Sequence, residues 1–66
     1  MVERIIEEME NEGKVVTALI YKDGEEEIEY VTDMESAVAI RYATLEDYEN
    51  NGFSTFGLTT NIQKIR

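Results

Sequence analysis

The chain contains no cysteine, histidine, proline or tryptophan. Without cysteine it can form no disulfide, and without cysteine and histidine we expect no structural zinc site. A nucleophilic triad needs a base beside serine or cysteine, and here only Ser36 and Ser54 remain. Carboxylates are plentiful, but a chain of 66 residues has no second lobe with which to build a catalytic cleft. We therefore expect no enzymatic activity, no metal and no cofactor.

Basic residues are also scarce. Six Lys and Arg stand against 15 Asp and Glu, which gives a net charge of −9. Because nucleic acids and anionic membranes are bound by clustered Lys and Arg, we expect direct contact with neither. The acidity has two interpretations: it serves solubility alone, or it complements a basic surface on a partner protein.

No apolar run is long. The longest spans residues 15–21, whereas a membrane-spanning helix needs about 20 residues. The first residues, Met1-Val2-Glu3-Arg4, are followed by glutamates and do not resemble a signal peptide. These features predict a cytoplasmic protein, in the host cytoplasm if a phage encodes it.

A hydrophobic fraction of 42% with clear periodicity argues against disorder and for one domain over residues 1–66. A domain of this size buries only about 60% of its unfolded surface. Its stability must come from tight packing or from a partner chain, so a homodimer is one option.

Two segments carry strong local patterns. Residues 2–11 place Val2, Ile5, Ile6 and Met9 on one helical stripe. Residues 14–22 and 25–31 are strand-like and are separated by Asp23-Gly24, a strong hairpin signal. Strict alternation puts Val15, Leu19 and Tyr21 on one face of the first strand and Val16, Ala18 and Ile20 on the other.

The second half of the chain is predicted to contain a helix over residues 33–51 and a strand over residues 53–60. Thr32 or Asp33 would cap the helix, with Glu35 completing a capping box, and Gly52 would end it. Its apolar stripe would be Met34, Ala37, Val38, Leu45 and Tyr48. The strand would turn Phe56 and Leu58 toward the core, and Ile62 or Ile65 would extend it.

Together these elements predict an α+β fold with the chain order α-β-β-α-β. The sheet would be antiparallel and three-stranded, in the order 2-1-3, with the main helix packed on one face.

Two acidic sets are candidate partner-binding sites. The first lies on the second hairpin strand and comprises Glu25, Glu26, Glu27 and Glu29. The second lies near the end of the predicted long helix and comprises Glu46, Asp47 and Glu49. The strand set has a structural alternative, since charge on an edge strand prevents unwanted strand pairing. For the helix set the alternative is ordinary solvation.

Further candidates interrupt the regular patterns. Arg41 falls within the apolar stripe, and Ile40 and Tyr42 flank it, so the three are candidate interface anchors. Snorkelling of Arg41, or its pairing with Glu26 or Glu35, explains it equally well. Residues 50–63 carry no charge, and we expect edge pairing with a partner or a second copy there. The residues named for this pairing are Ser54, Thr55, Phe56, Leu58 and Thr59.

The sequence therefore predicts a small acidic module that binds a basic site on a larger, nucleic-acid-handling protein. Small size, acidity and missing catalytic groups are typical of inhibitors from phages and mobile elements, some of which mimic nucleic acid, although no motif here is specific to them. The alternative is an assembly module, a homodimer or a subunit contact made through an apolar sheet face and the neutral edge.

Overall fold

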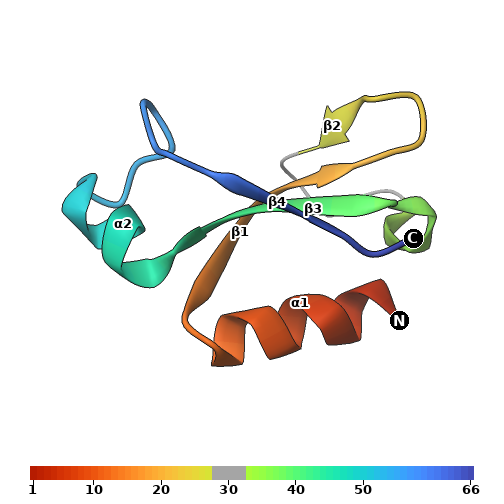
Figure 1. Cartoon of the computed structure of the whole chain (residues 1–66), viewed down its shortest axis with the longest axis horizontal. Coiled ribbons are helices and arrows are strands. Elements are labelled where there is room, and N and C mark those ends of the chain that lie inside the picture. The colour runs from red at the N-terminus through yellow and green to blue at the C-terminus, as the bar shows by residue number, and fades with distance from the viewer. Residues whose placement is uncertain (28–32) are drawn as a thin grey trace.

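A computed structural model describes residues 1–27 and 33–66. It contains α1 (Val2–Asn11), β1 (Lys14–Ile20), β2 (Glu26–Glu27), the 3₁₀ turn η1 (Met34–Ser36), β3 (Ala39–Thr44), α2 (Leu45–Asn50) and β4 (Asn61–Lys64) (Figure 1). The described strands form one sheet in the order β2-β1-β3-β4, and every neighbouring pair is antiparallel. The predicted α+β class is confirmed.

The N-terminal half follows the sequence patterns. Helix α1 spans the predicted residues and buries Val2, Ile6 and Met9. Strands β1 and β2 form the predicted hairpin, in which the amide of Gly24 donates to the carbonyl of Tyr21 at 2.9 Å. Gly24 has φ +87°, a value that glycine adopts at little cost. The rest of the predicted second strand, residues 28–31, lies outside the described residues.

The predicted helix over residues 33–51 is wrong. Its centre is strand β3, which pairs with β1 from Lys14 opposite Thr44 to Ile20 opposite Ala39. Alanine-rich segments favour helix locally, but a ladder of this length overrides a weak propensity. Within this segment only residues 45–50 are α-helical, and the helix that packs over the core face of the sheet is α1.

The predicted cap and strand in this half are also wrong. Glu35 caps no long helix: its Oε2 accepts the amide of Val2, at the start of α1, at 3.0 Å. Thr32 lies outside the described residues. Residues 53–60 form no strand, and the final strand is β4, which pairs with β3. The predicted order 2-1-3 places the two hairpin strands correctly. The strand beside β1 is β3, however, and not residues 53–60, and β4 adds a fourth strand.

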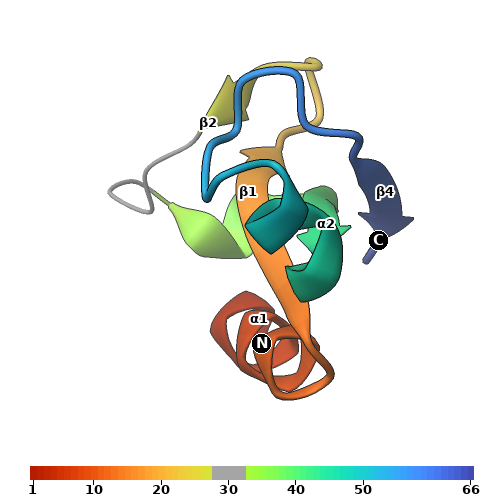
Figure 2. The same ribbon diagram turned by 90° about the vertical axis from the view of Figure 1, so that its left-hand side faces the viewer.

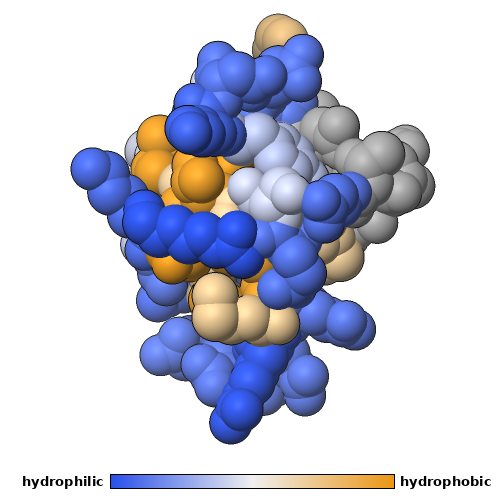
Figure 3. Space-filling model, turned by 90° about the vertical axis from the view of Figure 1, so that its right-hand side faces the viewer, coloured by the Kyte–Doolittle hydropathy of each residue, from blue (hydrophilic) through white to orange (hydrophobic). Residues whose placement is uncertain are grey.

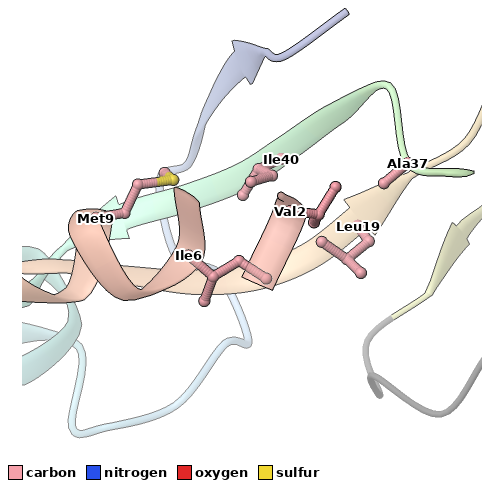
Figure 4. Packing of buried hydrophobic residues seen from close by; sticks show 6 residues of the cluster. All are labelled: Val2, Ile6, Met9, Leu19, Ala37 and Ile40. Atoms are coloured by element: carbon pink, nitrogen blue, oxygen red, sulfur yellow. The ribbon is translucent and has the colours of Figure 1, made fainter. Parts of the chain in front are cut away.

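The core lies between α1 and one face of the sheet, which we call the α1 face. Val2, Ile6 and Met9 of the helix pack with Leu19, Ile40 and Ala37 (Figure 4). Val16 and Tyr21 pack against the same cluster. The predicted split of Val16 and Leu19 onto opposite faces is wrong, because the register shifts between Val16 and Ala18. A bulge of this kind restarts the alternation.

Candidate protein-binding surface

The second face of the sheet, which we call the loop face, is covered differently. Residues 51–60 connect α2 to β4 and arch over the sheet on the side opposite α1 (Figures 1 and 2). The buried side chains of this face are small: Ala18, Ala39 and Ala43. Between loop and sheet lies a pocket of about 370 Å³. Its lining residues are Thr17, Ala18, Glu26, Arg41, Thr55, Leu58 and Thr60.

Arg41 links the loop to strand β2 across this face. Its Nε lies 2.7 Å from Oε1 of Glu26, and its Nη1 donates to Oγ1 of Thr60 at 3.0 Å. The hydrogen bond from Arg41 holds the pKa of Glu26 below its ordinary value and raises that of Arg41. The structural interpretation of Arg41, pairing with Glu26, is therefore what the structure shows. Arg41 and Glu26 satisfy each other and are poorly placed to bind a partner.

The other two candidate anchors face the core. Ile40 is completely buried between the sheet and α1, so its prediction as an interface anchor is wrong. Tyr42 packs against the same core, and the Nζ of Lys14 lies 5.3 Å from its ring centroid. Both point away from the loop face because they alternate with Arg41 along a strand instead of lying along a helix.

Helix α2 begins where β3 ends. The Oγ1 of Thr44 accepts the amide of Asp47 at 3.1 Å, which satisfies one free donor of the first turn. Glu46 and Asp47 therefore sit at the start of a short helix, not at the end of a long one. Their negative charge is favourable at this end of the helix dipole, whereas Glu49 lies near the C-terminal end of α2, where a negative charge is unfavourable.

The loop after α2 is ordered by its own hydrogen bonds. The side-chain amide of Asn51 donates to the carbonyl oxygens of Ser54 at 2.7 Å and of Phe56 at 2.9 Å. The amide of Phe56 donates to Oγ of Ser54 at 3.1 Å. Phe53 has φ +58°, which is unusual for a residue other than glycine. Its ring meets that of Tyr48 edge-on at 5.7 Å, a contact that favours this conformation.

This loop displays two aromatic rings to solvent. Phe56 is 91% exposed and Phe53 is 64% exposed. The prediction that Phe56 faces the core is wrong, and Leu58 is only half-buried. The predicted edge pairing of residues 54–59 has no strand to support it. The loop lies beside α2, because Asp47 lines the same pocket as Gly57 and Leu58.

Helix α2 and the loop that follows it carry Glu46, Asp47, Glu49, Phe53 and Phe56, and we call these five residues together the aromatic–acidic surface. All five are exposed. Among residues 1–27 and 33–66, no basic group lies within ion-pairing distance of these three carboxylates. The acidity was visible in the sequence, whereas the exposed aromatic pair was not.

The two predicted acidic sets do not meet. Glu26 pairs with Ile20 at one end of β1, whereas Thr44, which precedes α2, pairs with Lys14 at the other. The seven residues of β1 separate them by about 20 Å at ~3.3 Å per residue. Glu25 is exposed beside Glu26, Glu27 belongs to β2, and Glu29 lies outside the described residues.

Other kinds of site find little support in the described part of the chain. No group of three or more His, Cys, Asp or Glu there is arranged to hold a metal ion. No helix among these residues is both long and apolar enough to cross a membrane. No protein-family model matches the chain, and neither a curated protein nor a solved structure matches it.

Proposed function

We propose that the chain is a small protein-binding module whose aromatic–acidic surface docks on a basic site of a larger protein and inhibits or modulates it. The observation that carries the proposal is the display of Phe56, 91% exposed, on a loop held by hydrogen bonds. This loop follows a helix whose three carboxylates have no basic group within ion-pairing distance among the described residues. An exposed phenylalanine does not stabilise the fold, and its apolar surface is available for burial against a partner.

The physical roles of the two residue types differ. Buried aromatic side chains near the centre of an interface supply much of its binding energy. A loop already ordered before binding loses little conformational freedom, which preserves that energy. The carboxylates accelerate encounter with a basic surface and reject acidic ones. Because Arg41 neutralises Glu26, the docking charge belongs to α2 more than to β2.

The charge also indicates the kind of partner. The chain has a net charge of −9 on 66 residues. Its carboxylates can bind the same Lys and Arg side chains that hold phosphate groups in nucleic-acid-binding proteins. A nucleic-acid-handling enzyme has such side chains in its working site. Occupying that site would block it without any catalysis by the chain itself, as phage-encoded and mobile-element inhibitors do.

The test begins by capturing a partner on the immobilised chain and purifying it. Its dissociation constant is then measured by calorimetry at 50 and 300 mM salt. We expect Phe56→Ser to weaken binding about tenfold or more. Replacing Glu46, Asp47 and Glu49 with their amides should weaken binding and flatten its salt dependence, because surface charges are screened.

The matched control carries the same change in charge on α1, as Glu3→Gln, Glu7→Gln and Glu10→Gln. These three residues are also exposed, but they lie on the side of the sheet opposite the loop. Equal losses in both triple variants would show that only bulk charge matters. A dissociation constant that is the same at both salt concentrations and is unchanged by Phe56→Ser would refute the proposal.

A further inference from the structure

The two edge strands of the sheet, β2 and β4, differ in the charge of their side chains. The β2 edge carries Glu25 and Glu26, and charge of this kind prevents a second sheet from adding to it. The β4 edge consists of Asn61, Ile62, Gln63 and Lys64 and has no carboxylate. Ile62 is 53% exposed there. The β4 edge carries a single charge, Lys64, so it is the more open of the two edges to pairing.

The direction of the free backbone groups on β4 follows from its bonds to β3. The amide of Ile65 donates to the carbonyl of Val38 at 3.0 Å, and Gln63 lies opposite Ile40 in the same ladder. Inward and outward backbone groups alternate along an antiparallel strand. Gln63 and Ile65 thus face β3, whereas the N–H and C=O groups of Ile62 and Lys64 face outward.

We propose that a second copy of this chain pairs with β4 in antiparallel orientation and extends the sheet across a two-fold axis. Only pairings of outward residues with outward residues satisfy the exposed groups. The pairing whose two-fold axis passes through Gln63 sets Ile62 opposite Lys64 of the second copy, and Gln63 opposite Gln63 of the second copy. All four outward groups of each β4 are then used.

Side chains support this register. Ile62 lies opposite Arg41 in the ladder and so projects on the loop face. In the dimer the aliphatic stem of Lys64 from the second copy covers this exposed isoleucine. On the α1 face two Gln63 amides meet at the axis and can hydrogen bond to each other. The end of the molecule near the C-terminus shows an apolar area among hydrophilic side chains (Figure 3).

The charge distribution is what favours a second copy here and nowhere else on the sheet. Pairing at β4 leaves the two acidic β2 edges at opposite ends of the enlarged sheet, about 34 Å apart at ~4.8 Å per strand. The junction itself contributes only Lys64 and neutral residues. The remaining repulsion between two copies of charge −9 is screened by salt. Self-association should therefore strengthen with salt, opposite to the docking proposed above.

The first experiment is sedimentation equilibrium of the purified full chain over a wide concentration range at 50 and 300 mM salt. We expect a reversible monomer–dimer equilibrium that shifts toward dimer at the higher salt. A chain that stays monomeric at millimolar concentration under both conditions overturns the inference. Because no partner protein is present, failure here is distinct from failure of the docking proposal.

The second experiment tests the register. Gln63→Glu and Gln63→Lys each place like charges opposite one another at the axis, and each should raise the dissociation constant of the dimer about fivefold. Mixing the two variants should restore association as a heterodimer. A dimer indifferent to both variants does not use this edge, and that result also overturns the inference.

A backbone variant completes the test. Ile62→Pro removes an outward N–H that makes no bond within the β3–β4 ladder, so it should abolish the dimer and leave the fold intact. Ile62→Val is its control and should still dimerise. Circular dichroism melting of each variant confirms folding, and a folded Ile62→Pro chain that dimerises like the parent contradicts the proposed pairing.

Discussion

The two faces of the sheet are stabilised in different ways. On the α1 face, Leu19 and Ile40 are completely buried against three apolar side chains of one helix. On the loop face, the buried side chains are alanines, and the covering loop is joined to the sheet through Arg41 and Thr60. Apolar burial supplies most of the folding free energy of a small domain. The loop face therefore contributes less to stability, which leaves it free to carry large exposed side chains.

The largest effect should come from the α1 face. Leu19→Ala removes a completely buried side chain, and we expect it to lower the free energy of unfolding by about 3 kcal/mol. Ile62→Ala, on the loop face, removes a half-exposed side chain and should cost less than about 1 kcal/mol. Urea unfolding at low protein concentration measures both. Equal costs would remove the distinction between the faces.

Folding of the aromatic–acidic surface should depend on one local cap. Thr44→Ala removes the oxygen that accepts the amide of Asp47, and we expect a loss of about 1 kcal/mol. Thr44→Ser keeps that oxygen and should retain most of the stability. Urea unfolding of the two variants provides the comparison. A Thr44→Ala chain as stable as the parent would show that the loop, and not the cap, orders α2.

A stabilising substitution should exist on the α1 face. The hydroxyl of Tyr21 is buried, and it has no hydrogen-bond partner among the described residues. A buried unpaired hydroxyl is unfavourable, so Tyr21→Phe should raise the free energy of unfolding by up to about 1 kcal/mol. Tyr42→Phe is the control, with a change near zero. Thermal melts followed by circular dichroism suffice, and destabilisation by Tyr21→Phe would reveal a partner for that hydroxyl.

The smallest effect concerns a polar contact beside the apolar core. The amino group of Met1, the amide of Val2 and the charge of Arg66 together lower the pKa of Glu35 from its ordinary 4.5. A carboxylate whose pKa falls on folding adds stability above its unfolded pKa, and that stability disappears as pH drops through the folded value. Glu35→Gln should therefore lower the Tm at pH 7 and have progressively less effect below about pH 4.5.

Glu7→Gln is the control for this titration, because it makes the same change in charge on an exposed residue of α1. Its difference in Tm from the parent should not follow the same pH dependence. If the two variants change with pH in the same way, net charge and not the contact of Glu35 is responsible.

The accuracy of sequence reasoning differed between the halves of the chain for a physical reason. Helix α1 and the hairpin have strong local signals, a four-residue apolar stripe and an Asp-Gly turn. Strand β3 has none, because its loop-face residues include Ala39 and Ala43, which suit a helix equally well. The residues that broke the helical pattern, Ile40 and Arg41, were the sign of a strand: consecutive residues on opposite faces.

Only part of the candidate site could be predicted from the sequence, for the same reason. Glu46, Asp47 and Glu49 could be named because carboxylates favour solvent in any fold. The exposure of Phe56 could not, since phenylalanine in a strand-like segment is expected to face a core. Only the hydrogen bonds from the side chain of Asn51 and the positive φ of Phe53 and Gly57 reveal a loop there.

Glu35 has a consequence for engineering. The backbone of Val2 and the guanidinium of Arg66 both meet its carboxylate, so the two ends of the chain lie at the same end of the molecule (Figure 1). A few flexible residues could join them into a ring without crossing the sheet. New ends opened in the exposed Asp23-Gly24 turn would yield a circular permutant that keeps every strand of the sheet whole.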